Sequence, residues 1–132
     1  MDRTGVLRTL HDVGGAAWFG GSLMGATGLN AAADAAGPAD RDRVVTAGWE
    51  RWAPLAKAAL GAHVLGSVGL LATRRDRASV MRLALTTAAV GATAGTAKLG
   101  ADPNTPASTM HKLEWAIPVL LAGVVAIGVK GR

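Results

Sequence analysis

The chain has 132 residues, with 14 Lys or Arg and 9 Asp or Glu, so its formal net charge is +5. Half of the residues are hydrophobic and only 17% are charged, which excludes intrinsic disorder because a disordered chain needs low hydrophobicity and high charge. The sequence has no cysteine, which excludes a disulfide framework and any thiolate metal or redox site. The length fits one domain, residues 1–132.

Four long segments of the chain carry no charged residue: 13–33, 58–73, 83–97 and 115–129. A helix that crosses a bilayer needs about 20 mostly apolar residues, and flanking Lys, Arg or Glu side chains can extend the shorter segments by reaching toward the headgroups. A soluble bundle would place charges along one face of every helix, and these segments have none. We therefore predict an all-α bundle of four transmembrane helices, at about 9–33, 53–73, 79–101 and 111–130.

The distribution of basic residues predicts the orientation of these helices. With four spans, both termini and residues 74–82 lie on one side, which carries eight Lys or Arg residues against six on the other. Because cytoplasmic loops are enriched in Lys and Arg, we expect cytoplasmic termini and a location in the bacterial inner membrane. The basic residues anchor helix ends and do not alternate with aromatic residues, so we expect no nucleic-acid partner.

The segment between the first two predicted helices carries its own pattern. Gly37-Pro38 is expected to end the first helix. Residues 39–52 then predict a short amphipathic helix in the membrane interface, with Val45, Trp49 and Trp52 on one face. Together with Trp115, these tryptophans would form an aromatic belt at headgroup depth.

Two similarities between the halves of the chain raise a duplicated two-helix hairpin as a hypothesis. Gly25-Ala26-Thr27 recurs as Gly91-Ala92-Thr93, and Glu, Trp and Pro occur in similar order in residues 50–54 and 114–118. Two spans per half would make the repeats parallel. The alternative is chance similarity in a chain where 28 Ala and 18 Gly make up about a third of the residues.

Small residues recur at four-residue spacing within the charge-free segments. Such spacing lets helix backbones approach closely in lipid. We expect it to serve packing inside the bundle or, as the alternative, contact with a second copy or another membrane protein. The glycines assigned to helix packing are Gly21, Gly25, Gly66, Gly91 and Gly95.

An ionisable residue inside a membrane segment is a functional candidate by default, which selects His63. From the predicted spans, His11, His63 and His111 lie at depths that differ by roughly 10 Å, so no two of them in one chain could ligate one haem. We expect no cofactor and no metal site. The alternative is haem bound by His63 and its copy in a dimer. The plainer interpretation of His63 is a neutral imidazole bonded to Ser or Thr on a neighbouring helix.

A second group of polar residues is expected near the outer face, where it could form a vestibule. Within it, Lys98 is expected to pair with Asp34 or Glu114. The alternative is that these side chains only reach toward the interface. The group comprises Asn30, Asp34, Lys98, Asp102, His111 and Glu114.

Residues 10–22, LHDVGGAAWFGGS, resemble the opening helix of small actinobacterial four-span membrane proteins. The pattern Trp-x-Gly-Gly is similar to the first helix of the TMEM205-like and CopD-like groups, and the size and span count are similar to the DoxX-like group. The resemblance implies a four-span fold and transfers no catalytic residue.

No enzyme motif is present: there is no paired acidic motif, nucleophile elbow or phosphate loop. The leading hypothesis is a non-enzymatic structural, accessory or oligomeric subunit that lies in the bilayer. One alternative is a small transport or permeation unit, which requires His63 and Lys98 on one water-accessible path. The second is a haem- or quinone-linked redox protein that uses His63.

Overall fold

The computed structural model describes residues 2–73 and 75–130, with side chains up to residue 128. Every regular element in these ranges is helical. The first rod joins α1 (Arg3–Met24), a short π-helix η1 (Gly25–Leu29) and α2 (Asn30–Ala35) without a break, and three further long helices follow it. They are α3 (Arg41–Thr73), α4 (Arg77–Gly100) and α5 (Ala107–Lys130). The all-α class and the four long helices are confirmed.

Short polar residues set the helix boundaries. Asp2 caps α1 by accepting from the Gly5 amide at 2.7 Å, and Asp76 caps α4 through the Ser79 amide at 2.7 Å. These caps satisfy amides that have no partner inside the helix. Gly37 follows α2 with a φ of 82°, a left-handed conformation that glycine adopts without steric cost. The predicted end of the first helical rod at Gly37 is therefore confirmed.

The predicted interfacial helix over residues 39–52 is wrong as a separate element, because α3 runs unbroken from Arg41 to Thr73 through Pro54. A proline inside a helix removes one backbone hydrogen bond, and at the exposed Pro54 this loss does not interrupt the helix. The apolar face of the segment packs on the first rod: Trp52 lies against Gly21 and Trp49 against Gly25. These two tryptophans therefore form a helix contact, and their place in an aromatic belt stays a prediction.

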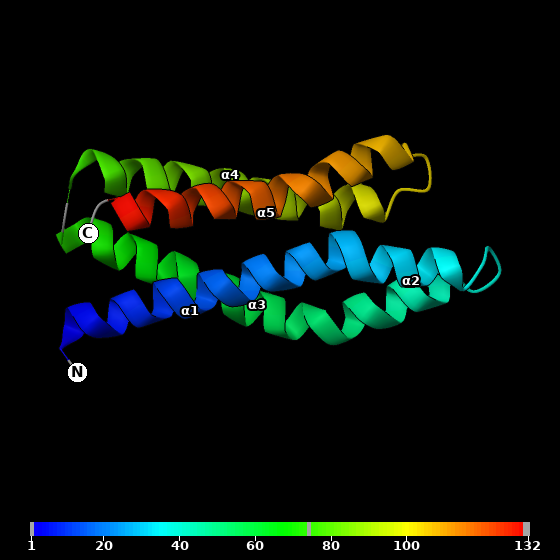
Figure 1. Cartoon of the computed structure of the whole chain (residues 1–132), viewed down its shortest axis with the longest axis horizontal. Helices are drawn as coiled ribbons and strands as arrows, with labels where there is room; N and C mark the ends of the chain where they lie inside the picture. The colour runs from blue at the N-terminus through cyan, green and yellow to red at the C-terminus, as the bar shows by residue number, and fades with distance from the viewer. Residues whose placement is uncertain (1, 74, 131–132) are drawn as a thin grey trace.

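The helices form two antiparallel hairpins that lie side by side, one of α1–α2 with α3 and the other of α4 with α5 (Figure 1). The start of α1, the end of α3, the start of α4 and the end of α5 lie at one end of the bundle, which we call the terminal end (Figure 1). The turns at 36–40 and 101–106 lie at the other end, which we call the loop end. The hairpin of α1–α2 and α3 extends beyond the α4–α5 turn at the loop end (Figure 1).

Glycines bring α1 and α3 into backbone contact. A Cβ atom at Gly14 would lie 2.6 Å from the Ala59 carbonyl oxygen, and one at Gly66 would lie 2.5 Å from the His11 amide nitrogen. Both distances are far shorter than the 3.4 Å of ordinary contact. Only glycine at these two positions permits the observed separation of the helices.

The remaining glycines assigned to helix packing differ from one another. Gly95 is in ordinary contact with Leu113, since its Cβ would lie 3.8 Å from that side chain, whereas nothing lies within 4 Å of a Cβ at Gly91. Gly91 therefore packs against no other helix of the described chain. The two Gly-Ala-Thr segments also differ, because Gly25 lies in the π-helix η1 and receives Trp49, and Gly91 lies in a regular α-helix.

All four long helices contribute to one hydrophobic core. Its buried members are Trp18 of α1, Ala59 of α3, Ala89 of α4, and Ile117 and Leu121 of α5. Two helices in the described part of the chain, Arg41–Thr73 and Ala107–Gly128, are long and apolar enough to cross a membrane. Their outward faces carry large apolar side chains that are more than half exposed, including Leu55, Leu65, Val68, Val119 and Val125.

Candidate functional site

His63 is buried at the junction of three helices, with only 1% of its surface exposed. Its Nδ1 lies 2.8 Å from the His11 carbonyl oxygen on α1, and its Nε2 lies 3.1 Å from Thr86 Oγ1 on α4. Because a carbonyl only accepts, Nδ1 carries the proton in this arrangement and the Nε2 of a neutral ring accepts from the threonine hydroxyl. The structure thus contains the bond to a neighbouring hydroxyl that the plainer interpretation of His63 expects.

Two consecutive glycines make room for this ring on α1. Gly14 lets the backbone of α3 approach, and a Cβ at Gly15 would lie 2.7 Å from His63 Nδ1. A side chain at either position would push the imidazole away from the His11 carbonyl. Gly14-Gly15 therefore forms a slot for His63.

His11 lies directly beside His63, with ring centroids 4.4 Å apart and ring planes inclined by 38°. The prediction that the two rings differ in depth by roughly 10 Å is wrong. Helix α1 begins at Arg3 rather than near residue 9, so His11 lies eight residues from the start of α1, and His63 lies ten residues from the end of α3. In an antiparallel pair, these positions are nearly level. The Nδ1 of His11 lies 2.9 Å from Asp12 Oδ1, an arrangement in which the ring donates to the carboxylate.

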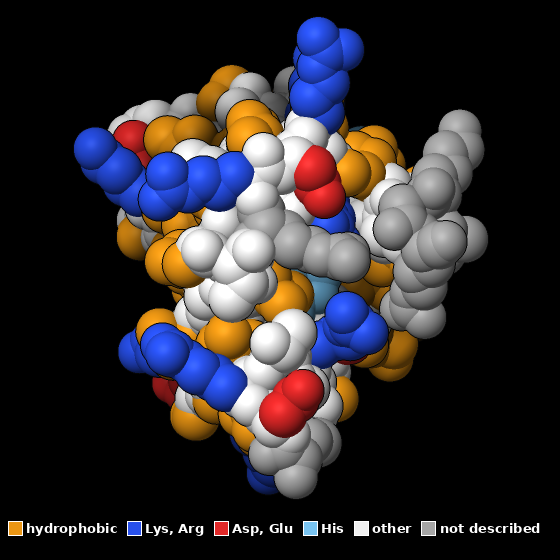
Figure 2. Space-filling model, turned by 90° about the vertical axis from the view of Figure 1, so that its left-hand side faces the viewer, with side chains coloured by type: hydrophobic (Ala, Val, Ile, Leu, Met, Phe, Trp, Pro, Cys, Tyr) orange, Lys and Arg blue, Asp and Glu red, His pale blue; other side chains and the backbone are white. Residues whose placement is uncertain are grey.

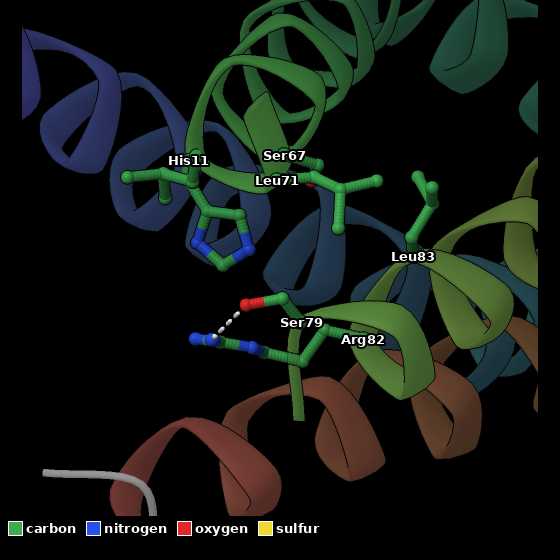
Figure 3. Close-up of a pocket in the computed structure, with 7 residues that line it drawn as sticks. His11, Ser67, Leu71, Ser79, Arg82 and Leu83 are labelled. Atoms are coloured by element: carbon green, nitrogen blue, oxygen red, sulfur yellow. Dashed lines mark hydrogen bonds between the residues drawn. The ribbon is translucent and has the colours of Figure 1, made fainter. Parts of the chain in front are cut away.

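Beyond His11, the first turns of α4 add two polar side chains. Arg82 Nη2 donates to Ser79 Oγ at 3.3 Å, and the His11 ring points toward both residues (Figure 3). The space between them, also bordered by Ser67, has a volume of about 10 Å³, which is close to the minimum for one water molecule. Ser67 itself donates to the His63 carbonyl at 2.8 Å.

A larger cleft of about 1000 Å³ lies between α1 and α5 and reaches His11 and His63. We call it the α1–α5 cleft. Arg8, Asp12 and Arg82 line its part nearest the terminal end, whereas Phe19 and Leu121 line its inner part. Seen from the terminal end, histidine surface is visible at the bottom of a hollow bordered by basic side chains (Figure 2). The cleft therefore joins a polar region to an apolar one.

The His11–His63 pair does not have the arrangement that haem ligation requires. Both ring nitrogens of His63 are engaged by hydrogen bonds, so neither offers a free lone pair to iron. The two rings also lie against each other instead of facing a shared point between them. Among the residues that the structure describes, no group of three or more His, Cys, Asp or Glu side chains could hold a metal ion.

The six polar residues expected in a vestibule lie toward the loop end, but they form separate contacts. Asn30 donates to Glu114 Oε2 at 2.8 Å and so links the first rod to α5. Asp34 pairs with Arg41 at 3.0 Å across the turn that follows α2. The expected ion pair of Lys98 with Asp34 or Glu114 is not formed between these described residues, because both carboxylates contact other partners.

The other two members of this group have local contacts. Asp102 Oδ1 accepts from the Asn104 amide at 2.9 Å within the α4–α5 turn, and the His111 ring lies 6.4 Å from that of Trp115. None of the six lines either cavity at the terminal end. His63 and Lys98 therefore do not share one cavity wall.

Sequence reasoning selected His63 but missed the residues that hold it. Gly14 and Gly15 form a Gly-Gly pair shortly after His11, and Thr86 carries a hydroxyl within a charge-free segment. Glycine and threonine are both common in this chain, so neither can be identified as a neighbour of His63 until the pairing of the helices is known. Arg82 was assigned only an anchoring role, and its place in a cleft depends on how α4 packs against α3 and α5.

The chain matches no protein-family model, and no curated protein or solved structure is significantly similar to it. The resemblance of residues 10–22 to the first helix of small four-span proteins stays a prediction. Within the structure, this stretch supplies His11, Gly14 and Trp18 to the buried face of α1.

Proposed function

We propose that this chain is a four-span protein of the bacterial plasma membrane that acts as a non-enzymatic, self-associating subunit. Helices α3 and α5 have the length and hydropathy of membrane spans. Helix α1 packs along α3, α4 packs along α5, and all four helices share one core. A bilayer that surrounds α3 and α5 therefore also surrounds α1 and α4. This side-by-side packing supports a four-span placement.

The charges of α4 fit the thickness of a bilayer. Arg82 and Lys98 enclose a segment without charge that is about 24 Å long at 1.5 Å per residue. Side chains that reach outward from its two ends would cover a hydrocarbon layer about 30 Å thick. Near the terminal end of α1, Asp12 is a carboxylate that accepts from His11. The hairpin tip that extends beyond the α4–α5 turn would then lie outside the bilayer.

The outer face of α4 is the observation that carries self-association. Its exposed residues include Ala84, Ala88, Gly91 and Ala94, and a Cβ at Gly91 would meet no atom of the chain within 4 Å. Small residues on an outward face let a second helix approach closely, and this close packing drives helix association in lipid. By contrast, the outward faces of α3 and α5 carry Leu and Val side chains suited to lipid, whereas the exposed large apolar residues of α4, Val80 and Met81, lie in its first turns. We therefore place the contact between copies on α4.

A matched pair of substitutions tests this interface. Gly91→Leu is expected to abolish the dimer or higher oligomer in mild detergent. Gly61→Leu is expected to leave it intact, because Gly61 on α3 is equally open within the chain. Since the chain has no native cysteine, oxidative crosslinking of Ala88→Cys in native membranes reports the same contact in lipid. A monomeric parent chain, or equal loss in both glycine variants, would overturn the α4 interface.

Labelling of intact cells tests the orientation. A membrane-impermeant thiol reagent is expected to label Ala39→Cys in the loop-end turn and to spare Thr4→Cys near the amino terminus. Both positions are exposed, so accessibility within the fold does not limit either reaction. Labelling of Thr4→Cys alone would reverse the orientation, and labelling of both would contradict the four-span placement.

A further inference from the structure

The α1–α5 cleft opens sideways from the bundle as well as toward the terminal end. Ala16 on α1 and Ala122 and Val125 on α5 line the cleft and are also exposed, so they form an apolar rim between the two helices. If the four helices span a bilayer, this rim faces the acyl chains. The cleft is then accessible to a molecule that is already dissolved in the membrane.

The polar part of the cleft carries an excess of positive charge, with Arg8 and Arg82 against the single carboxylate of Asp12. Arg82 is half-buried, and its guanidinium donates to neutral acceptors, Ser79 Oγ at 3.3 Å and the Ala78 carbonyl at 3.4 Å. Neither Arg8 nor Arg82 forms an ion pair with a carboxylate of the described residues. Asp12 also lines the cleft, where His11 contacts it at 2.9 Å. A partly desolvated cation that forms no ion pair is costly in the membrane and favours an anionic partner.

The dimensions of the cleft fit a molecule that has one charged end and one apolar end. Arg8 and Phe19 line it along about 16 Å of α1, at 1.5 Å per residue. The inner walls are apolar and carry Phe19, Leu121 and Val124. A volume of about 1000 Å³ is at the upper end of the range for small-molecule sites. A soluble anion would contact only the arginine end and leave the apolar walls without a partner.

We propose that the α1–α5 cleft binds one anionic phospholipid, with the headgroup phosphate on Arg82 and Arg8 and an acyl chain between Phe19 and Leu121. Anionic lipids are enriched in the cytoplasmic leaflet, and basic pockets between transmembrane helices bind their headgroups. The remaining arginines at the terminal end, among them Arg3, Arg75 and Arg77, add to the positive potential around the entrance. This site rests on the four-span placement and is independent of the α4 interface.

The test is native mass spectrometry of the purified full-length chain in neutral detergent, titrated separately with phosphatidylglycerol and phosphatidylcholine. One phosphatidylglycerol per chain is expected to bind, with much weaker binding of phosphatidylcholine. Arg82→Gln is expected to weaken phosphatidylglycerol binding by about tenfold or more, because it removes a charge-assisted hydrogen bond to the phosphate. Arg77→Gln is the matched control, since it removes an equal charge at the same end from a residue that does not line the cleft.

A second variant separates loss of the site from loss of the fold. Ala122→Trp places a large ring on the exposed rim of the cleft and is expected to block phosphatidylglycerol with an unchanged unfolding midpoint. Equal binding of both lipids would overturn the role of the arginines. Equal loss in Arg77→Gln and Arg82→Gln would show diffuse attraction instead of a site, and displacement by inorganic phosphate would show a free-anion site. Since binding is counted per chain, failure of the α4 interface alone would leave this result unchanged.

Discussion

Replacing Gly66 with alanine places a methyl group at the closest point between α1 and α3. The new Cβ would lie 2.5 Å from the His11 amide nitrogen and 2.7 Å from the Leu7 carbonyl oxygen. Both of these atoms belong to the backbone of α1, so neither can turn aside as a flexible side chain can. To restore ordinary contact at 3.4 Å, the two helices would have to separate locally by about 0.9 Å.

Opposing terms determine the size of this effect. Inserting a methyl group into a tightly packed contact costs about 1–3 kcal/mol. Separation of the helices also stretches the 2.8 Å hydrogen bond from His63 to the His11 carbonyl, which is worth about 1 kcal/mol. Alanine offsets about 1 kcal/mol of these costs, because it is a better helix former than glycine. We therefore expect Gly66→Ala to lower the free energy of unfolding by about 1–3 kcal/mol.

Gly61→Ala supplies the control within the same helix. A Cβ at Gly61 would have no heavy atom within 4 Å, so only the gain in helix propensity remains, and the stability should stay equal or rise by up to about 1 kcal/mol. The assay is equilibrium unfolding in mixed micelles with increasing dodecyl sulfate, followed by far-UV circular dichroism and tryptophan fluorescence. Equal midpoints for the two variants would refute the backbone contact between α1 and α3.

Two further predictions concern the polar contacts between helices. Thr86→Val keeps the side-chain shape but leaves the Nε2 of His63 without its hydrogen-bond partner. We expect the free energy of unfolding to fall by about 1–3 kcal/mol in the same assay. The control is Thr87→Val at an exposed neighbouring position, which should change the free energy of unfolding by less than about 0.5 kcal/mol. Asn30→Asp would place a second carboxylate beside Glu114 and is expected to lower the unfolding midpoint. Addition of Glu114→Gln should restore the midpoint, and no rescue would contradict the 2.8 Å contact between α2 and α5.

Most helix boundaries were predictable from charge spacing and capping chemistry. The predicted segments 79–101 and 111–130 differ by four residues or fewer from α4 and α5. The larger error, at the start of α3, arose because residues 39–52 were assigned to a separate helix that ends just before Pro54. Proline is favourable in a first helical turn, but an exposed proline also occurs where a helix continues and packing on both sides of it fixes the path. Here, Trp49 and Trp52 supply that packing before Pro54, and Ala59 and His63 supply it after Pro54.

The geometry of the candidate site was less predictable, because it depends on how helices pair rather than on any one helix. A shift of six residues in the start of α1 changes the predicted depth of His11 by about 9 Å. This shift alone accounts for the predicted separation of His11 from His63. The partners Thr86 and Arg82 lie on α4, which belongs to the other hairpin, and no periodicity in the sequence specifies how two hairpins rotate against each other. The ionisable residue itself could be found, since it is unusual within a charge-free segment.

The abundance of glycine and the buried histidine are parts of one arrangement. An imidazole in a membrane helix is costly unless both of its nitrogens find partners, and a backbone carbonyl of a neighbouring helix is within reach only when the two backbones nearly touch. Gly14 and Gly66 permit that approach, and Gly15 leaves the volume that the His63 ring occupies. Small residues therefore allow a polar side chain to be satisfied inside this bundle. The α1–α5 cleft lies beside the His63 ring, and both histidines line it.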